Sequence, residues 1–153
     1  MDNHPLETQA NLNKIATLAT GIAHCGSMIA MSDITDGASN TYLFGEKYLD
    51  ADHYTDGLGR GDNENMYMGD NGDIVRWGGR VGYAGTDAYR GFLPLQDTPN
   101  YAAYLMFGSA HASGFHMAFC DGSVHATSYS IDAETHARLA NRKDGLPIDA
   151  SQF

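Results

Sequence analysis

The chain has 153 residues and a formal net charge of −10, with 18 glycines, 15 aspartates and only 4 glutamates. A surface this acidic repels nucleic-acid backbones and anionic lipids, so we expect neither as a partner. No stretch approaches the roughly 18 apolar residues of a membrane-spanning helix, and we expect no membrane insertion by this chain. Asp and Gly favour turns and Glu favours helix, so the composition predicts many turns and short strands within one domain, residues 1–153.

The first third of the chain predicts short elements. Residues 5–17 read as a short helix or as the end of a longer one, with a proline in the first turn. Residues 18–31 contain two short apolar runs, which we interpret as strands around a turn. Ser32 or Asp33 is placed to cap a single helical turn. Residues 40–48 alternate and are rich in Thr, Tyr, Leu and Phe, which predicts a strand.

The centre, residues 50–91, is a long Asp/Gly-rich loop. Interleaved aromatic residues argue against disorder, and we expect short strands near Tyr67 and at 74–77. Residues 101–107 are an apolar strand or short helix. Two uses are open for the aromatic residues of this region: a sugar-stacking or partner-binding surface, or closure of the core beneath the loop. The residues concerned are Trp77, Tyr83, Tyr89 and Phe92.

The last third predicts the clearest structural unit. Alternating runs at 115–119 and 123–129 flank Asp121-Gly122, which is typical of a β-hairpin with a type I′ turn. Asp132 is placed to cap a helix over 133–142. The fold class is therefore α+β: a small antiparallel β-sheet packed on a C-terminal helix, with the long loop beside it.

Two separated motifs resemble one family. A segment Ser-Asp-Ile-Thr-Asp-Gly-Ala-Ser-Asn-Thr at 32–41 precedes a strand that ends in Gly-Glu, and His111 is followed by nine residues and then Asp-Gly. This resembles the bacterial family of prepilin-like proteins of unknown function with a C-terminal H-X9-DG motif. Shorter matches occur at 54–57, 61–63, 66–67, 76–77 and 144–149. The motif residues are Asp33, Asp36, Gly37, Asn40, Glu46, His111, Asp121 and Gly122.

The resemblance implies an extracytoplasmic, pseudopilin-like head domain. Members of the family usually begin with a type IV pilin-like signal and a long apolar helix, neither of which is present here, so the resemblance implies a longer parent. It further implies a cell-surface, periplasmic or secreted location, a pilus-like or type II secretion-like system, and other pilin-like subunits or self-association. We expect a non-catalytic structural or assembly role. The alternative is a metal- or carbohydrate-binding module that contacts surface glycans.

The H-X9-DG motif has two readings. In one, Asp121-Gly122 forms the turn and His111 hydrogen-bonds the backbone or an aspartate. In the other, His111, His116 and Asp121 form a metal or glycan site, because neutral imidazole binds metals when suitably placed partners are present. Ser109 and the serine at 113 flank His111 without the arrangement of a catalytic triad, so we expect no enzyme.

Two further candidates concern calcium and a disulfide. Carboxylate and amide oxygens crowd the acidic loop and suit Ca²⁺, although the spacing is not that of an EF-hand and the same residues also shape turns. Cys25 and Cys120 either pair, in an oxidising compartment, or remain two buried thiols. The candidate calcium ligands are Asp62, Asn63, Glu64, Asp70, Asn71 and Asp73.

Overall fold

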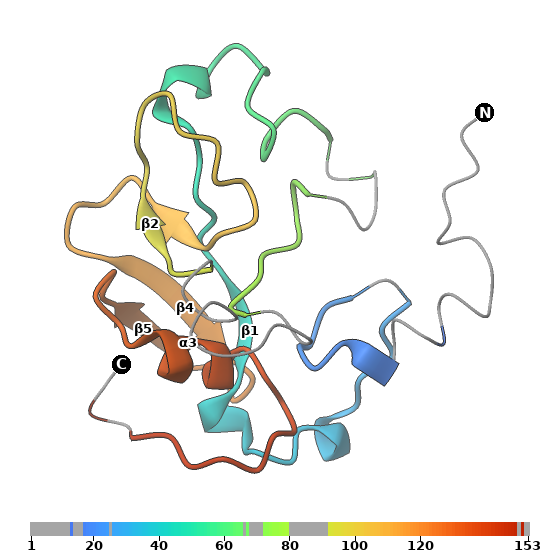
Figure 1. Cartoon of the computed structure of the whole chain (residues 1–153). Coiled ribbons are helices and arrows are strands. Elements are labelled where there is room, and N and C mark those ends of the chain that lie inside the picture. Colours follow the sequence, from blue (N-terminus) through green and yellow to red (C-terminus); the bar gives the residue numbers. More distant parts are fainter. Residues whose placement is uncertain are drawn as a thin grey trace.

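The computed structural model describes residues 13, 17–24, 26–65, 67, 72–79, 92–149 and 151, and its centre is a three-stranded antiparallel sheet (Figure 1). The strand order is β1–β4–β5, and two short parallel strands, β2 and β3, form a second sheet. This architecture confirms the α+β class. The bounds are β1 Tyr42–Gly45, β2 Leu95–Gln96, β3 Gly108–Ser109, β4 Phe115–Phe119, β5 Val124–Thr127 and α3 Ala133–Leu139, with 3₁₀ turns η1 Met31–Asp33, η2 Ala38–Asn40 and η3 Ala51–His53.

The core lies between the inner face of the sheet and α3. Phe115, Met117 and Phe119 alternate along β4 and are fully buried, as the period of two predicts. Tyr42 of β1 packs edge-on against Phe119 with ring centroids 5.2 Å apart. Leu139 of α3 joins the same cluster. The expected packing of the sheet on the helix is therefore confirmed. Burial of each of these side chains contributes about 1.5–3 kcal/mol, which makes this core the main source of stability.

The hairpin β4–β5 is confirmed, but its turn differs from the prediction. The amide N of Gly122 donates to the Phe119 carbonyl at 3.0 Å, and the Phe119 amide donates to the Ser123 carbonyl at 2.9 Å. Gly122 has φ of 89°, whereas Asn100 is the one non-glycine residue with positive φ among those described. The loop therefore has three residues and a glycine bulge, and the type I′ prediction was wrong because Asp121 keeps a negative φ.

The C-terminal helix begins as predicted and ends early. The Asp132 carboxylate accepts a hydrogen bond from the Thr135 amide at 2.9 Å, which confirms the cap. The helix ends at Leu139, and Arg142 is held by contacts with a distant segment of the chain. Its guanidinium donates to the carbonyls of Ala19 and Gly21 at 3.1 and 2.6 Å. A buried contact to a distant segment thus replaces the expected last turn.

Several predicted strands were wrong. The described parts of 18–31 and 74–77 contain no strand, although the turn inside 18–31 is present. Tyr67 lies in a turn, and the segment 101–107 contributes a single bridge from Phe107 to Lys47. Most of the expected helix at 5–17 lies outside the described residues. In the part of the chain that the structure describes, no helix has the length and apolar character to span a bilayer.

Candidate functional site

The candidate site lies where the end of β1 meets the start of β4. Glu46 directly follows β1, and its backbone is held from both sides. Its amide donates to the His116 carbonyl at 3.1 Å, and its carbonyl accepts from the Gly108 amide at 3.0 Å. His116 is the second residue of β4, and His111 lies in the loop just before that strand. Antiparallel pairing therefore brings together residues that are 70 positions apart.

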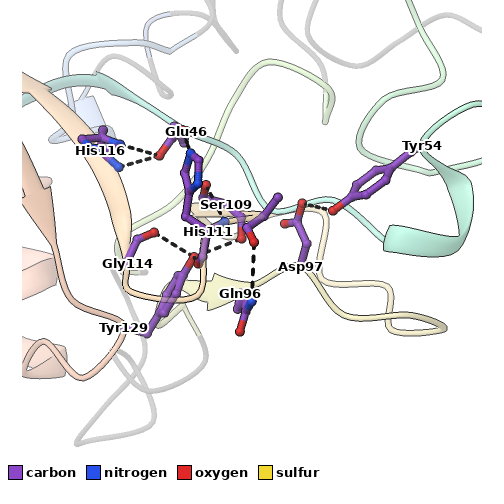
Figure 2. A network of polar contacts seen from close by, with 10 residues as sticks. Glu46, Tyr54, Gln96, Asp97, Ser109, His111, Gly114, His116 and Tyr129 are labelled. Atoms are coloured by element: carbon purple, nitrogen blue, oxygen red, sulfur yellow. Dashed lines mark hydrogen bonds and ion pairs between the residues drawn. The ribbon is translucent and has the colours of Figure 1, made fainter.

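Three side chains converge at this position (Figure 2). Glu46 Oε2 accepts from the His116 backbone amide at 2.6 Å and lies 3.1 Å from His116 Nδ1. The second carboxylate oxygen, Oε1, is 3.9 Å from His111 Nε2. The two imidazole rings stand nearly perpendicular, at 88°, with centroids 6.1 Å apart. Two ring nitrogens and a carboxylate thus face one another at the surface.

The loop that carries His111 is tied down by Tyr129. The Tyr129 hydroxyl lies 2.7 Å from the His111 carbonyl and 3.0 Å from the carbonyls of Ser109 and Gly114 (Figure 2). A phenol has one proton, so it donates to one of these carbonyls at a time. The Tyr129 ring also stacks on Phe115, and burial raises the pKa of its hydroxyl. The backbone that carries the imidazole is therefore anchored to the core.

Of the two readings of the motif, the one that makes Asp121-Gly122 the turn is confirmed for these two residues, whereas the one that groups Asp121 with His111 and His116 takes the wrong third residue. Asp121 lies beyond the far end of β4, where its carboxylate accepts from the Ser123 amide at 2.8 Å and the Ser123 hydroxyl at 2.7 Å. These bonds, with one from Ser39, lower the pKa of Asp121 to about 2. Glu46 takes its place beside His111 and His116. The Gly-Glu that ends the predicted strand was a signal for it, but only the strand pairing shows its neighbours.

The remaining motif residues tie chain segments together. Asp36 accepts from the amides of Asp144 and Gly145 at 2.6 and 2.9 Å, and the Asn40 side chain donates to the Asp36 carbonyl at 3.2 Å. Gly37 has φ of 97°, which favours glycine. Asp33 is the last residue of η1 and does not cap it from the front, since its carboxylate accepts from the backbone amide at residue 30 at 2.8 Å. These residues have structural partners within the chain.

The candidate calcium loop already contains two cationic side chains. Lys47 Nζ lies 2.5 Å from Asp62 Oδ1, 2.9 Å from the Gly61 carbonyl and 3.3 Å from the Asp73 carbonyl. Arg76 donates to the Gly61 carbonyl at 3.2 Å and to the carbonyl of residue 72 at 2.6 Å. The Asp73 carboxylate accepts from the Glu64 amide. Calcium at these oxygens would have to displace a cation; with Asp70 and Asn71 outside the described residues, the calcium site stays a prediction.

The cysteine and aromatic predictions reach residues outside the described part. Cys120 Sγ lies 3.7 Å from the Tyr42 carbonyl, and burial raises the pKa of its thiol. Cys25 lies outside the described residues, so the disulfide stays a prediction. Trp77 stacks on Phe92 with centroids 6.1 Å apart and remains 42% exposed, while Tyr83 and Tyr89 lie outside the described residues.

Comparison with known proteins gives one family. The family model SBP_bac_10, described as a protein of unknown function (DUF1559), matches residues 1–134. The chain belongs to the DUF1559 family. The match includes both β1 and β4, and hence all three residues of the candidate site in this DUF1559 chain. No curated protein and no solved structure matches it.

Proposed function

We propose that this chain is the non-catalytic head domain of a prepilin-like protein that acts outside the cytoplasm, in the assembly of a pilus-like or type II secretion-like surface system. Membership of the DUF1559 family and the ordered motifs around β1 and β4 support this proposal. The arrangement at Ser109 favours a structural role, since its hydroxyl accepts from the His111 backbone amide at 3.2 Å and makes no hydrogen bond with the His111 imidazole among the described residues.

The outer face of the sheet carries the proposal. Phe44, Ala118 and Val124 pair directly across β1, β4 and β5 and therefore share one face. Phe44 is 67% exposed and Val124 is 65% exposed, although both lie on regular strands. Ala118 between them is buried, at 7% exposure, so the two exposed side chains flank it on one rigid face, and apolar side chains grouped on one face suit a protein contact. We name these three residues the apolar row and propose that it contacts another pilin-like subunit, including a second copy of this chain.

Self-association tests this contact. We expect the chain to associate in sedimentation velocity, and the double variant Phe44→Ser, Val124→Ser to sediment as a monomer. Leu58→Ser is the matched control, because Leu58 is 68% exposed and lies away from the sheet. An unchanged association constant in the double variant would remove the apolar row as the contact.

Location is tested on the intact parent protein. The proposal expects the parent to be accessible to protease added outside whole cells, or to appear in the periplasmic or culture fraction. Retention of the intact parent in the cytosolic fraction would refute the extracytoplasmic role, whatever the outcome of the association experiment.

A second candidate function is carbohydrate or calcium binding beside the acidic loop. A depression of about 260 Å³ lies there, lined by Asp50, His53, Arg60, Asp62 and Asn100 among others. Convergent polar groups in a concave surface suit a sugar ligand. A glycan array and a thermal melt with and without Ca²⁺ test this alternative, since a ligand at 100 times its Kd stabilises by about 2.7 kcal/mol. Absence of any bound glycan and of any Ca²⁺ shift would remove it.

A further inference from the structure

We propose that Glu46, His111 and His116 bind one divalent first-row transition-metal ion of the zinc class. These residues each offer a ligand atom, and the three atoms lie within 4.8 Å of one another. The proposal is independent of the assembly role, because its residues lie at the start of β4 and do not include the apolar row.

The distances suit a tetrahedral ion. Zinc binds imidazole nitrogen at about 2.0–2.1 Å and carboxylate oxygen at about 2.0–2.2 Å, which places the ligand atoms roughly 3.3 Å apart. His116 Nδ1 lies 3.1 Å from Glu46 Oε2, and His111 Nε2 lies 3.9 Å from Glu46 Oε1. With one ligand atom taken from each residue, the three atoms lie within 4.8 Å of one another, so they must close by up to about 1.5 Å to reach the tetrahedral separation. The side chains of Glu46, His111 and His116 are 36%, 64% and 53% exposed, so they can make the small closing rotation without disturbing the core.

The backbone holds the three donors in place before an ion binds. Glu46 is hydrogen-bonded on one side to β4 and on the other to Gly108, and the carbonyl of His111 is tethered by Tyr129. The His116 amide donates to Glu46 Oε2, which fixes the carboxylate and leaves Oε1 facing His111. Such outer hydrogen bonds orient metal ligands and increase affinity. The site is therefore built on a strand pair, with one member on an anchored loop.

The donor set selects the class of metal. Two nitrogens and one oxygen favour zinc, nickel, cobalt or copper, whereas calcium requires six to eight oxygens. Three protein ligands leave at least one position for water or another oxygen ligand. A surface depression of about 320 Å³, lined by Ser113, Ala126 and Thr127 as well as both histidines, lies next to the pair and provides the room.

Calorimetric titration of the tag-free full chain with ZnCl₂ tests the proposal, with and without excess CaCl₂ as a competitor. We expect one zinc per chain, bound with an affinity that calcium does not change, because calcium bound at the acidic loop would not use these three residues. His111→Ala, His116→Ala and Glu46→Gln should each weaken zinc binding by at least about tenfold. His53→Ala is the matched control, because His53 is also paired with a carboxylate, at 2.8 Å from Asp56, yet lies elsewhere. It should leave the affinity unchanged.

Two measurements on the unaltered chain guard against misfolded variants. Cobalt substitution should give visible bands of a nitrogen- and oxygen-ligated ion without a thiolate charge-transfer band, which would otherwise implicate a cysteine. Zinc should shift the ring resonances of His111 and His116 in nuclear magnetic resonance spectra. Absence of zinc binding, a thiolate band, or affinity that depends on His53 and not on His111 would overturn the proposal.

Discussion

Protonation of His136 should make the fold sensitive to acid. His136 lies on α3 with no solvent exposure, and its ring packs against Tyr42, Phe107 and Phe115 with centroids 5.5, 5.8 and 6.2 Å away. The Tyr42 hydroxyl shares a hydrogen bond of 3.2 Å with His136 Nδ1, while Nε2 has no partner among the described residues. This burial lowers the pKa of His136 from 6.5 to about 4. The folded chain thus holds the ring neutral.

The sign and size of the effect follow from proton linkage. Below pH 6.5 the unfolded chain takes up a proton at this ring, whereas the folded chain does so only near pH 4. The contribution of the neutral His136 ring to the free energy of unfolding is therefore complete above pH 6.5. It is lost as the pH falls from 6.5 to about 4. Each pH unit costs up to about 1.36 kcal/mol, so the loss reaches about 3 kcal/mol. That is a large part of the about 5–15 kcal/mol of a typical domain.

Urea denaturation across this pH range measures the effect. The double variant Tyr42→Phe, His136→Phe replaces both hydrogen-bonding partners with rings of similar size, which avoids leaving a buried hydroxyl unpaired. Titratable groups elsewhere contribute equally to both proteins, so the difference between the two curves isolates His136. We expect the difference in unfolding free energy to change by about 3 kcal/mol between pH 6.5 and pH 4. Parallel curves would refute the argument.

The remaining predictions concern turns, the C-terminal tail and the thiol. Gly108→Ala should lower the free energy of unfolding more than Gly122→Ala in urea melts, because a Cβ at residue 108 would lie 2.2 Å from the Leu95 carbonyl. A Cβ at residue 122 meets no atom, and its positive φ costs only about 1–2 kcal/mol. Equal losses of stability in the two variants would contradict this. Asp36→Ala should lower the free energy of unfolding by about 1.5–3 kcal/mol, because the amides of Asp144 and Gly145 lose their acceptor. These amides should then exchange hydrogen faster, and unchanged protection would disprove the anchoring role. Cys120 should react with iodoacetamide more slowly than free cysteine at neutral pH, because burial raises its pKa, and equally fast labelling by mass spectrometry would show an accessible thiolate.

Local signals in the sequence predicted the elements that depend on few neighbours. The hairpin follows from alternation around Asp121-Gly122, and the start of α3 follows from the Asp132 cap. The end of α3 could not be predicted in this way, because Arg142 leaves the helix to bond carbonyls more than 120 positions away. The expected strands in 18–31 failed for a related reason: an apolar run becomes a strand only where another strand is free to pair with it.

The candidate site was predictable as residue types and not as a group. His111 and His116 are close in sequence, and their association required only the loop before β4. Glu46 joins them through strand pairing across 70 positions, which no spacing within the sequence reveals. Asp121 was grouped with the histidines because it belongs to the same motif. It lies in the turn beyond β4, however, and the strand from His116 to Phe119 alone spans about 10 Å.

The nine-residue spacing of the motif is the length of one strand with its connections. It comprises a three-residue loop at 112–114, the five residues of β4 and Cys120. Because β1 and β4 are antiparallel, the His111 end meets Glu46, while the Asp121 amide donates to the Ala38 carbonyl at 3.2 Å and the Cys120 amide to the Thr41 carbonyl at 2.9 Å. The two motifs of the sequence therefore flank the two strands of one pair, the first motif around β1 and the second around β4.

The requirements of folding explain the residues at one end of this strand pair, but not the placement of His111 at the other. At the far end, the Asp121 carboxylate is satisfied by Ser123, and Gly122 supplies the positive φ that the turn requires. At the near end, His111 Nε2 lies 3.9 Å from the Glu46 carboxylate, which is beyond hydrogen-bonding distance, and the side chain is 64% exposed. In this position, the His111 ring therefore contributes little to the stability of the fold. A ligand held between His111, Glu46 and His116 accounts for this placement, whereas the requirements of the turn account for the Asp-Gly pair.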